Sequence, residues 1–275
     1  GSIQMMYSAS YYWAGKAPAT QFTCSVPFGM NVQQTNAWFY HGGGHALWHE
    51  FYAKHGLIAF VAGNTGTQMG GWYRKELKSV DDYKGLKMRI PGLGGKVVAA
   101  LGGTVVLLAQ QEIFPALERG VIDATEWVGP YHDFSMGLHQ AAKYYYSPGW
   151  HEPSTANELT INLKAWQSLP KEFQVMIEHA AYKLNMDNLA EFDAKNLEYL
   201  NKIKALGKVE FKQYPDDLLK ALYKASEKIN QEVADSDPDA RKVYESYKKF
   251  RDGMRLWHNI NEVAYQNALK TVGAI

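Results

Sequence analysis

Arg89 is the residue whose surroundings in the sequence most clearly suggest chemistry. It ends a short apolar stretch in the segment LKMRIPGLGG, residues 86–95, and a helix is expected from about Lys96. An arginine offers a planar fork of donors that matches a carboxylate. The N-terminus of the following helix adds positive potential and free N–H groups. The segment therefore predicts a site for a small anion.

Two glutamates also follow apolar stretches. Glu126 stands before Trp127 and a Gly-Pro turn, and Glu152 lies in the segment PGWHEP, residues 148–153. Two carboxylates at strand ends can act as an acid/base pair, or can bind a hard cation together with carbonyl oxygens. They can also simply cap surface turns. Gln68, on a glycine-rich loop, offers a neutral oxygen or a solvated side chain, and the residues alone leave these interpretations open.

Three other motifs fail on inspection. The segment HGGGH, residues 41–45, resembles the oxyanion loop of lipases, but the chain contains no G-x-S-x-G elbow. His45 and His49 have the spacing of a zinc-binding pair on a helix, but Ala53 stands where H-E-x-x-H requires a second histidine. The glycines before Lys96 do not make a Walker loop, because Val97 follows that lysine.

Composition excludes several classes of protein. The 275 residues carry a formal net charge of +1, which argues against a nucleic-acid partner. No apolar run approaches about 18 residues, the length needed to span a membrane. Cys24 is the single cysteine, so the chain forms no internal disulfide.

The first half of the chain alternates between short strands and short helices. We predict strands at residues 57–62, 87–90, 104–108 and 121–125, and helices at residues 96–101 and 111–119. This alternation is typical of an α/β fold with a largely parallel sheet. Ligands bind beyond the carboxyl ends of strands in such sheets, where Arg89 and Glu126 both lie.

The second half is mainly helical. A helix predicted from Pro170 to about Leu206 would be roughly 50 Å long, enough to bridge two domains. Asp237 and Pro238 have the residue types of a helix cap and first position, and the helical region after them ends near Lys270. Strands are predicted at residues 157–163 and 209–214, and a further helix at residues 216–233.

Four segments together resemble the extracytoplasmic solute-binding subunits of TRAP transporters. They are GNTGTQMGGW, LKMRIPGLGGKV, ALERGVIDATEWVGPY and YYYSPGWHEP. The segments EWVGPY and GWHEP resemble the branch that binds 2-oxo acids and related small monocarboxylates. The resemblance implies a two-lobed periplasmic-binding-protein-like fold with mixed, mainly parallel sheets and a long helix along both lobes.

The resemblance also implies a division of the chain. We expect lobe I at residues 1–66 and 155–194, and lobe II at residues 67–154 and 195–275 with the C-terminal helices. Relatives begin with strand and helix units upstream of Tyr12, so the first lobe is expected to be N-terminally incomplete here. The expected location is the periplasm.

For the site, the resemblance implies a substrate carboxylate paired with Arg89 and a sodium or calcium ion that bridges protein and substrate. The matching cation ligands are the side chains of Gln68, Glu126 and Glu152 and the main-chain carbonyl of Trp127. The residues expected to contact the substrate are Arg89, Gln68, Glu126, Tyr12, Trp13, Phe28 and Asn157.

The function implied is capture of a small 2-oxo or 2-hydroxy monocarboxylate and its delivery to membrane subunits, with no covalent chemistry. The alternative is a metal-dependent lyase that uses Glu126 or Glu152 as a base. A third expectation concerns pairing, because some relatives dimerise by exchanging a C-terminal helix. Leu256 and Trp257 are then candidate contacts of a homodimer, although an intramolecular core explains them equally well.

Overall fold

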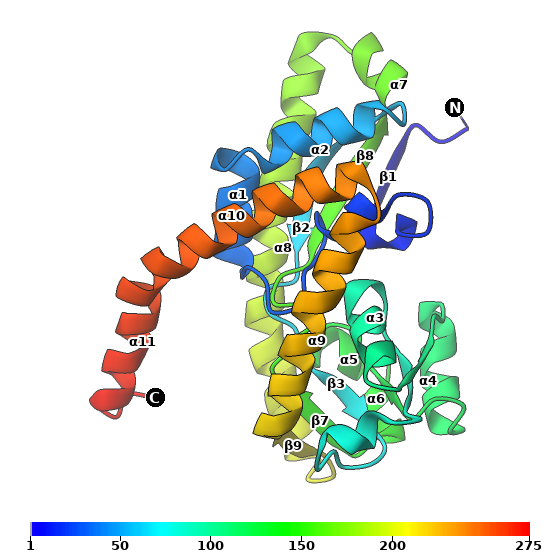
Figure 1. Ribbon diagram of the computed structural model, residues 1–275, viewed down its shortest axis with the longest axis vertical. Helices are drawn as coiled ribbons and strands as arrows, with labels where there is room; N and C mark the ends of the chain where they lie inside the picture. Colours follow the sequence, from blue (N-terminus) through cyan, green and yellow to red (C-terminus); the bar gives the residue numbers. More distant parts are fainter. Residues whose placement is uncertain (1) are drawn as a thin grey trace.

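The computed structural model describes residues 2–275, and the chain folds around two β-sheets placed one above the other (Figure 1). The upper sheet has the strand order β1 (Met5–Ala9), β8 (Ala156–Asn162), β2 (Leu57–Asn64), and both of its ladders are antiparallel. We call the part built around this sheet the upper lobe, and the remainder the lower lobe.

The lower sheet is mixed, as predicted. Its strand order is β5 (Thr104–Val106), β4 (Lys87–Arg89), β6 (Ala124–Thr125), β3 (Gly71–Tyr73), β7 (Tyr144–Ser147), β9 (Glu210–Gln213). β4 pairs in parallel with β5 and β6, and β7 pairs in parallel with β9. β3 is antiparallel to both of its neighbours. The alternation of strands and helices thus correctly predicted the α/β class and the parallel β5–β4–β6 unit, but not the antiparallel upper sheet.

Aromatic side chains fill the core of the upper lobe. Trp38, Phe39 and Trp48 come from two consecutive helices and pack with Tyr244 and Tyr247 of a late helix. The helices of this lobe are α1 (Val32–His41), α2 (Gly44–Ala53), α7 (Leu163–Ser168) and α10 (Pro238–Ile260), with 3-10 turns η1 (Ser10–Trp13) and η2 (Pro18–Gln21).

The lower lobe packs its helices around the mixed sheet. They are α3 (Gly92–Ala100), α4 (Gln110–Glu118), α5 (Pro130–Ser135), α6 (Leu138–Ala141) and α9 (Asp216–Asp235), with the 3-10 turn η3 (Val80–Tyr83). The C-terminal end of α9 reaches the upper lobe, where Val233 and Ala234 join its core. α3 begins four residues before the predicted Lys96, because the glycines belong to the helix and not to a loop. A Cβ atom at Gly95 would lie 2.7 Å from the carbonyl oxygen of Ile90, so this close approach requires glycine.

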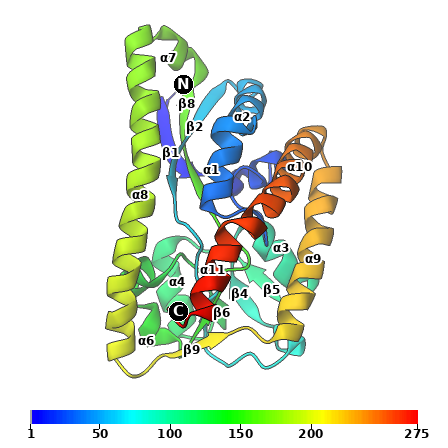
Figure 2. The same cartoon turned by 90° about the vertical axis from the view of Figure 1, so that its left-hand side faces the viewer.

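One long helix joins the two lobes. α8 (Lys171–Ala205) has 35 residues and runs along the full height of the molecule (Figure 2), as predicted. It packs against β2 in the upper lobe and α5 in the lower lobe. Buried Ala181 and Asn185 mark its upper contacts, and Phe192 and Ile203 its lower ones.

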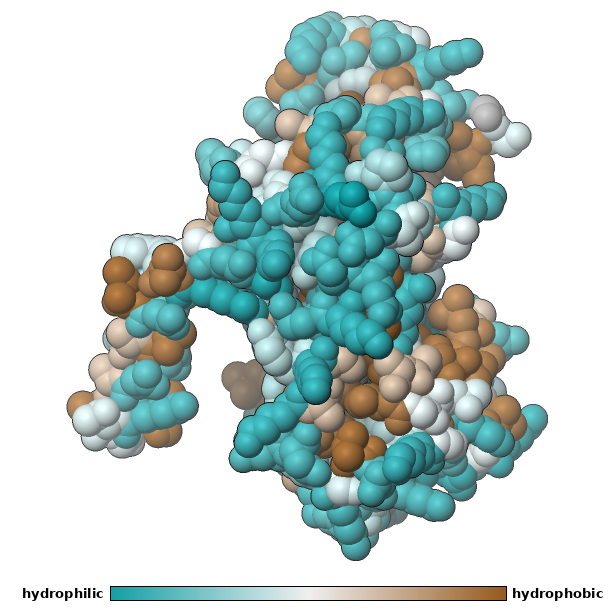
Figure 3. Space-filling view, viewed as in Figure 1, coloured by the Kyte–Doolittle hydropathy of each residue, from teal (hydrophilic) through white to brown (hydrophobic). Residues whose placement is uncertain are grey.

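The chain ends in a projecting arm. The side chain of Asp237 accepts a hydrogen bond from the backbone N–H of Ala240, which confirms the predicted cap of α10. After Asn261 the chain continues as α11 (Glu262–Thr271), whose described residues are all at least partly exposed. We call residues 256–275 the C-terminal arm, and it extends away from the body (Figures 1 and 3). Among residues 2–275, none of the helices combines the length and apolar character that crossing a membrane requires.

The C-terminal helices were expected in the second lobe. α10 packs against α9 and also against α1, α2 and η2 of the upper lobe. The reason lies in the apolar face of α10, where Val243, Tyr244 and Tyr247 complete the aromatic core of that lobe.

Candidate functional site

Four loop segments meet at one edge of the lower sheet. Arg89 is the last residue of β4, and Glu126 directly follows the parallel strand β6. β3 runs antiparallel to β6, so the loop before it, which carries Gln68, reaches the same edge. β7 is antiparallel to β3, so Glu152 on the loop after β7 arrives there too. The sheet topology therefore gathers the four predicted side chains.

Backbone hydrogen bonds fasten these segments to one another. The N–H of Gln68 donates to the carbonyl of Glu152 at 3.1 Å, and that of Met69 donates to the carbonyl of Val128 at 3.0 Å. The N–H of Glu126 donates to the carbonyl of Arg89 at 3.3 Å. The functional side chains thus stand on backbone that is held on several sides, which limits the rearrangement that binding requires.

A buried aspartate holds the loop that follows Glu126. One carboxylate oxygen of Asp133 accepts hydrogen bonds from the N–H groups of Val128 and Gly129, each at 3.1 Å. The other accepts from the Trp72 indole and the Tyr145 hydroxyl. Burial raises the pKa of Asp133 to about 6, although these hydrogen bonds favour its charged form.

Arg89 and Glu126 form a buried ion pair. Nη1 of Arg89 lies 2.5 Å from Oε1 of Glu126 and also donates to the main-chain carbonyl of that residue at 3.1 Å. Both side chains are almost fully buried. The guanidinium lies 4.9 Å from the ring centre of Trp127, a cation–π contact. The Nε atom of Arg89 has no hydrogen-bond partner within residues 2–275, so the guanidinium retains donor capacity.

Glu152 is held by neutral groups. Its Oε2 accepts a hydrogen bond from Nε2 of Gln68 at 2.8 Å and another from the hydroxyl of Thr155. Burial and the nearby carboxylate of Glu126 raise the pKa of Glu152, against the opposing influence of His151, Thr155 and Arg89. A positive charge placed between these two carboxylates would offset the repulsion between them.

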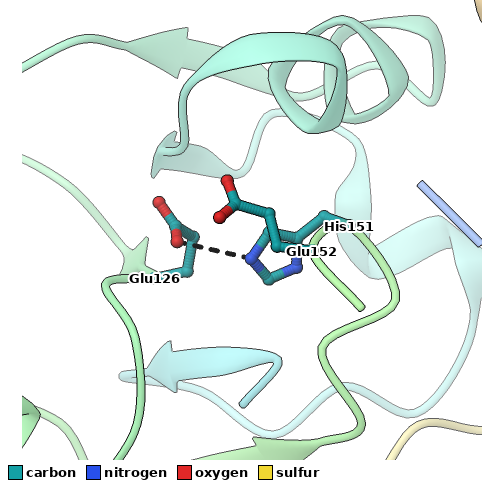
Figure 4. Close-up of side chains that lie close together, drawn as sticks. All are labelled: Glu126, His151 and Glu152. Carbon is teal, nitrogen blue, oxygen red and sulfur yellow. Dashed lines mark hydrogen bonds and ion pairs between the residues drawn. The ribbon is translucent and has the colours of Figure 1, made fainter. Parts of the chain in front are cut away.

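The donor set fits a hard cation. Oε1 of Gln68 is buried and accepts no hydrogen bond from the described residues, so it retains lone pairs. Glu126 and Glu152 belong, with His151, to a buried group whose ligand atoms all lie within 4.8 Å of one another (Figure 4). Carboxylate and amide oxygens are the ligands that calcium and similar cations prefer. Trp127, whose main-chain carbonyl was expected as a further ligand, lines the cavity beside this cluster.

A cavity of about 300 Å³ lies beside this cluster, between the two lobes. The lower lobe contributes Gln68, Arg89 and Trp127, while Tyr12 of η1 and Asn157 of β8 come from the upper lobe. The remaining lining residues are Tyr7, Ser8, Ala9, Tyr11, Thr65, Val128, His132, Thr155, Asn188 and Phe192. A small anion in this space would therefore touch both lobes.

Two residues expected at the pocket wall lie elsewhere. Trp13 lines a separate cavity of about 340 Å³ in the upper lobe, together with Phe51 and Leu57. Phe28 has its ring centre 6.0 Å from that of Trp150 and contacts Tyr223 edge-on. Neither side chain belongs to the lining of the cavity beside Arg89.

The structure adds residues that the sequence did not single out. His151 belongs to the same buried group as Glu126 and Glu152, with Nε2 3.3 Å from Oε2 of Glu126. The hydroxyl of Thr155 donates a hydrogen bond to Glu152, and Tyr11 lines the cavity. His151 could have been found, because it stands next to Glu152 in the segment PGWHEP. Nothing in the sequence pattern marks Thr155 or Tyr11.

The histidine pair on α2 does not form a metal centre. The rings of His45 and His49 are stacked with centres 5.7 Å apart, and Nε2 of His49 lies 2.8 Å from the carbonyl of Ala59. Burial and the neighbouring His49 lower the pKa of His45 to about 4. Within the part of the chain that the structure describes, only Glu126, His151 and Glu152 form a metal-binding group of three.

Comparison with protein families identifies relatives over most of the chain. The sequence model of the family described as "bacterial extracellular solute-binding protein, family 7" matches residues 1–237. A protein of Nostoc sp., named a monocarboxylate 2-oxoacid-binding periplasmic protein, is 47% identical over 97% of this chain and 73% of its own length.

Two crystal structures resemble the fold closely. A TRAP periplasmic solute-binding protein of Colwellia psychrerythraea, solved with calcium and pyruvate, is 41% identical, with a TM-score of 0.94 over 98% of this chain and 82% of that one. A second TRAP protein, of Pseudoalteromonas atlantica, was solved with sodium and pyruvate. It is 40% identical, with a TM-score of 0.93 over 97% of this chain and 81% of that one.

Proposed function

This chain belongs to family 7 of the bacterial extracellular solute-binding proteins, and we propose that it is the receptor of a TRAP-type transporter for a small 2-oxo or 2-hydroxy monocarboxylate. The ligand is bound together with sodium or calcium and delivered to the membrane subunits. The observation that carries this proposal is the pairing of Arg89, which retains donor capacity, with two buried acids and the unpartnered oxygen of Gln68.

Each group has a separate task in this proposal. Arg89 binds the substrate carboxylate, while Gln68, Glu126, Glu152 and the carbonyl of Trp127 hold the cation. The cation offsets the charge of the two acids and binds the oxygen next to the substrate carboxylate. A 2-oxo or 2-hydroxy acid suits this arrangement because its two oxygens form a five-membered chelate. Tyr12 and Asn157 close the cavity from the upper lobe.

We also propose how the lobes are used. The chain is expected to cross between them near residues 66, 154 and 194, and it crosses again where α9 leads into α10. Ligand contacts on both sides favour the closed arrangement, which is a shift of population. The protein acts outside the cytoplasm, in the periplasm. Binding without turnover is expected, and a lyase that uses Glu126 or Glu152 as a base is the alternative. Loss of a 2-oxo acid in an NMR time course over hours would support that alternative.

Calorimetry tests the proposal directly. Pyruvate, 2-oxobutyrate and lactate are titrated into the protein in buffer that contains neither sodium nor calcium, and again with one of these ions present. We expect binding heat that requires one of the two cations. If none of the three acids gives heat under any of these conditions, the monocarboxylate assignment is wrong.

Arg89→Ala isolates the carboxylate-binding role. The loss of a buried charge-assisted contact predicts at least about 100-fold weaker binding of pyruvate, or about 2.7 kcal/mol. Arg74→Ala, at an exposed arginine of the lower lobe, is the matched control and should bind as the wild type does. Wild-type affinity in Arg89→Ala would exclude the role assigned to Arg89.

The C-terminal arm supports a homodimer. Leu256, Trp257, Ile260 and Tyr265 are exposed on it, and apolar surface follows the arm in Figure 3. Exchange of the arm between two copies would cover these side chains. Light scattering should give the mass of a dimer for the full chain and of a monomer for a chain that ends at Gly253. A dimer that persists in the shorter chain would rule out exchange.

A further inference from the structure

His151 is the one member of the buried metal-binding group to which no role has been given. Its side chain is fully enclosed, and Nε2 lies 3.3 Å from Oε2 of Glu126. Figure 4 shows this nitrogen directed at Glu126, while the other ring nitrogen is turned away from it. The imidazole and Arg89 thus contact the two different oxygens of the Glu126 carboxylate, Oε2 and Oε1.

The chemistry of the contact fixes the direction of the hydrogen bond. Oε1 of Glu126 already accepts a hydrogen bond from Nη1 of Arg89 at 2.5 Å. A carboxylate in an ion pair acts as an acceptor, so we assign the hydrogen of this 3.3 Å contact to Nε2 of His151, which donates it to Oε2 of Glu126. A nitrogen that donates a hydrogen bond has no lone pair left for a cation. Nδ1, which has no hydrogen-bond partner in residues 2–275, lies on the far side of the ring.

The ring is held in place by its surroundings. A Cβ atom at Gly94 would lie 2.9 Å from Cβ of His151, so the glycine in the first turn of α3 leaves the room that the histidine occupies. The ring of Trp150 lies edge-on to the imidazole, with 5.4 Å between the two ring centres. The glycine-rich segment after Arg89 therefore serves the packing of His151 as well as the start of the helix.

We propose that His151 is a positioning residue of the cation site, an inference that rests on the proposed function. It holds Glu126 by Oε2 while Arg89 holds Oε1. When a substrate carboxylate also accepts hydrogen bonds from Arg89, the hydrogen bond from His151 keeps the carboxylate of Glu126 directed at the cation. A carboxylate offers about four lone-pair directions, so each oxygen can accept these bonds and still bind the ion. His151 itself does not ligate the cation.

The test compares His151→Met with His151→Gln. Glutamine places an N–H donor at about the distance of Nε2, and methionine has a similar length without a donor. Calcium is titrated calorimetrically into each variant at a fixed excess of pyruvate. Outer partners of metal ligands are worth about 10–100-fold in affinity. We expect a loss of this size in His151→Met, affinity within about threefold of wild type in His151→Gln, and similar melting temperatures without calcium.

Two further measurements separate positioning from ligation and from folding. If His151 acts through Glu126, His151→Met should weaken calcium binding little in a Glu126→Gln background. Manganese bound with pyruvate should show no ¹⁴N coupling from a directly bound imidazole in electron spin-echo spectra. Wild-type affinity in His151→Met, equal losses in both variants, or such a coupling would overturn the inference. Failure of the wild type to bind pyruvate with calcium or sodium would instead contradict the proposed function, and the inference with it.

Discussion

Glu152 and Glu158 are close in sequence and both buried, but their surroundings differ. Glu152 lies among Glu126, His151 and Arg89, and Gln68 bonds it with one end of an amide whose other end has no partner in residues 2–275. Glu158 lies at the upper-lobe cavity that Trp13 lines, and the hydroxyl of Tyr52 is 2.8 Å from both of its carboxylate oxygens. Burial raises the pKa of each acid.

The contrast separates two uses of a buried acid. A raised pKa follows from burial alone and does not by itself mark a binding site. Glu152 differs because charges of both signs, and an acceptor of Gln68 that no residue of 2–275 uses, converge on it from three other segments of the chain. Glu158 interacts with the hydroxyl groups of Tyr52 and Thr160, and apolar side chains line most of its cavity. Convergence of charge, rather than burial, is therefore the feature that distinguishes the candidate site.

The largest effect on cation affinity is expected when Glu152 is neutralised, in comparison with the same change at Glu158. Glu152→Gln removes one charge from the cation site and should weaken calcium binding in the presence of pyruvate about 100-fold, or about 2.7 kcal/mol. Glu158→Gln, the matched control, should leave it within about twofold. Calorimetry of both variants makes the comparison, and equal losses would erase the distinction drawn between the two acids.

The second effect concerns stability alone. Tyr52→Phe removes the hydroxyl that lies 2.8 Å from both oxygens of Glu158 and leaves a buried acid without that donor. The free energy of unfolding should fall by about 1–3 kcal/mol, with calcium and pyruvate affinity unchanged. Denaturant titration measures the first quantity. A loss of ligand affinity in Tyr52→Phe would show that the upper cavity and the site are coupled.

The third effect is the pH dependence of stability. Burial raises the pKa of Glu158 to about 7, from an ordinary 4.5, while the Tyr52 hydroxyl opposes the shift. The folded protein therefore holds this proton more tightly than the unfolded chain does. Stability from this group is complete below about pH 4.5 and is lost as the pH rises to about 7, with a slope of at most about 1.4 kcal/mol per pH unit.

Glu158→Gln checks this dependence. The variant should flatten the fall in unfolding free energy between about pH 4.5 and 7, measured by denaturant titration at several pH values without cations. Glu152 also has a raised pKa, so part of the slope should remain. A slope identical to that of the wild type would mean that Glu158 does not titrate in this range.

The smallest effect tests how Glu152 is held. Thr155→Val keeps the shape of the side chain but removes the hydroxyl that bonds Oε2. Because Gln68 still donates to the same oxygen, calcium affinity in the presence of pyruvate should fall only about threefold to tenfold. Thr160→Val, beside the Glu158 cavity, is the control and should not change it. An unchanged affinity in Thr155→Val would mean that the hydrogen bond from Gln68 alone is sufficient to position Glu152.

Much of the fold was predictable because its signals are local. Apolar periodicity predicted α8, a capping pair predicted the start of α10, and strand ends placed Arg89 and Glu126 together. Glycines misled the prediction of α3, since helix propensity does not register that a Cβ atom at Gly94 would lie only 2.9 Å from Cβ of His151. The pocket wall was predicted less well, because the exposure of Trp13 and the packing of Phe28 depend on neighbours distant in sequence.

The sequence by itself determined the residue types of the site: an arginine at a strand end, two acids after apolar stretches and an amide on a glycine-rich loop. The small anion follows from these residue types, whereas the cation was implied by the family resemblance. Only the tertiary structure decided which atoms meet. The mixed order of the lower sheet brings four loops to one edge, and packing against α3 turns His151 toward Glu126. Side-chain direction arises from such long-range contacts, which no local pattern encodes.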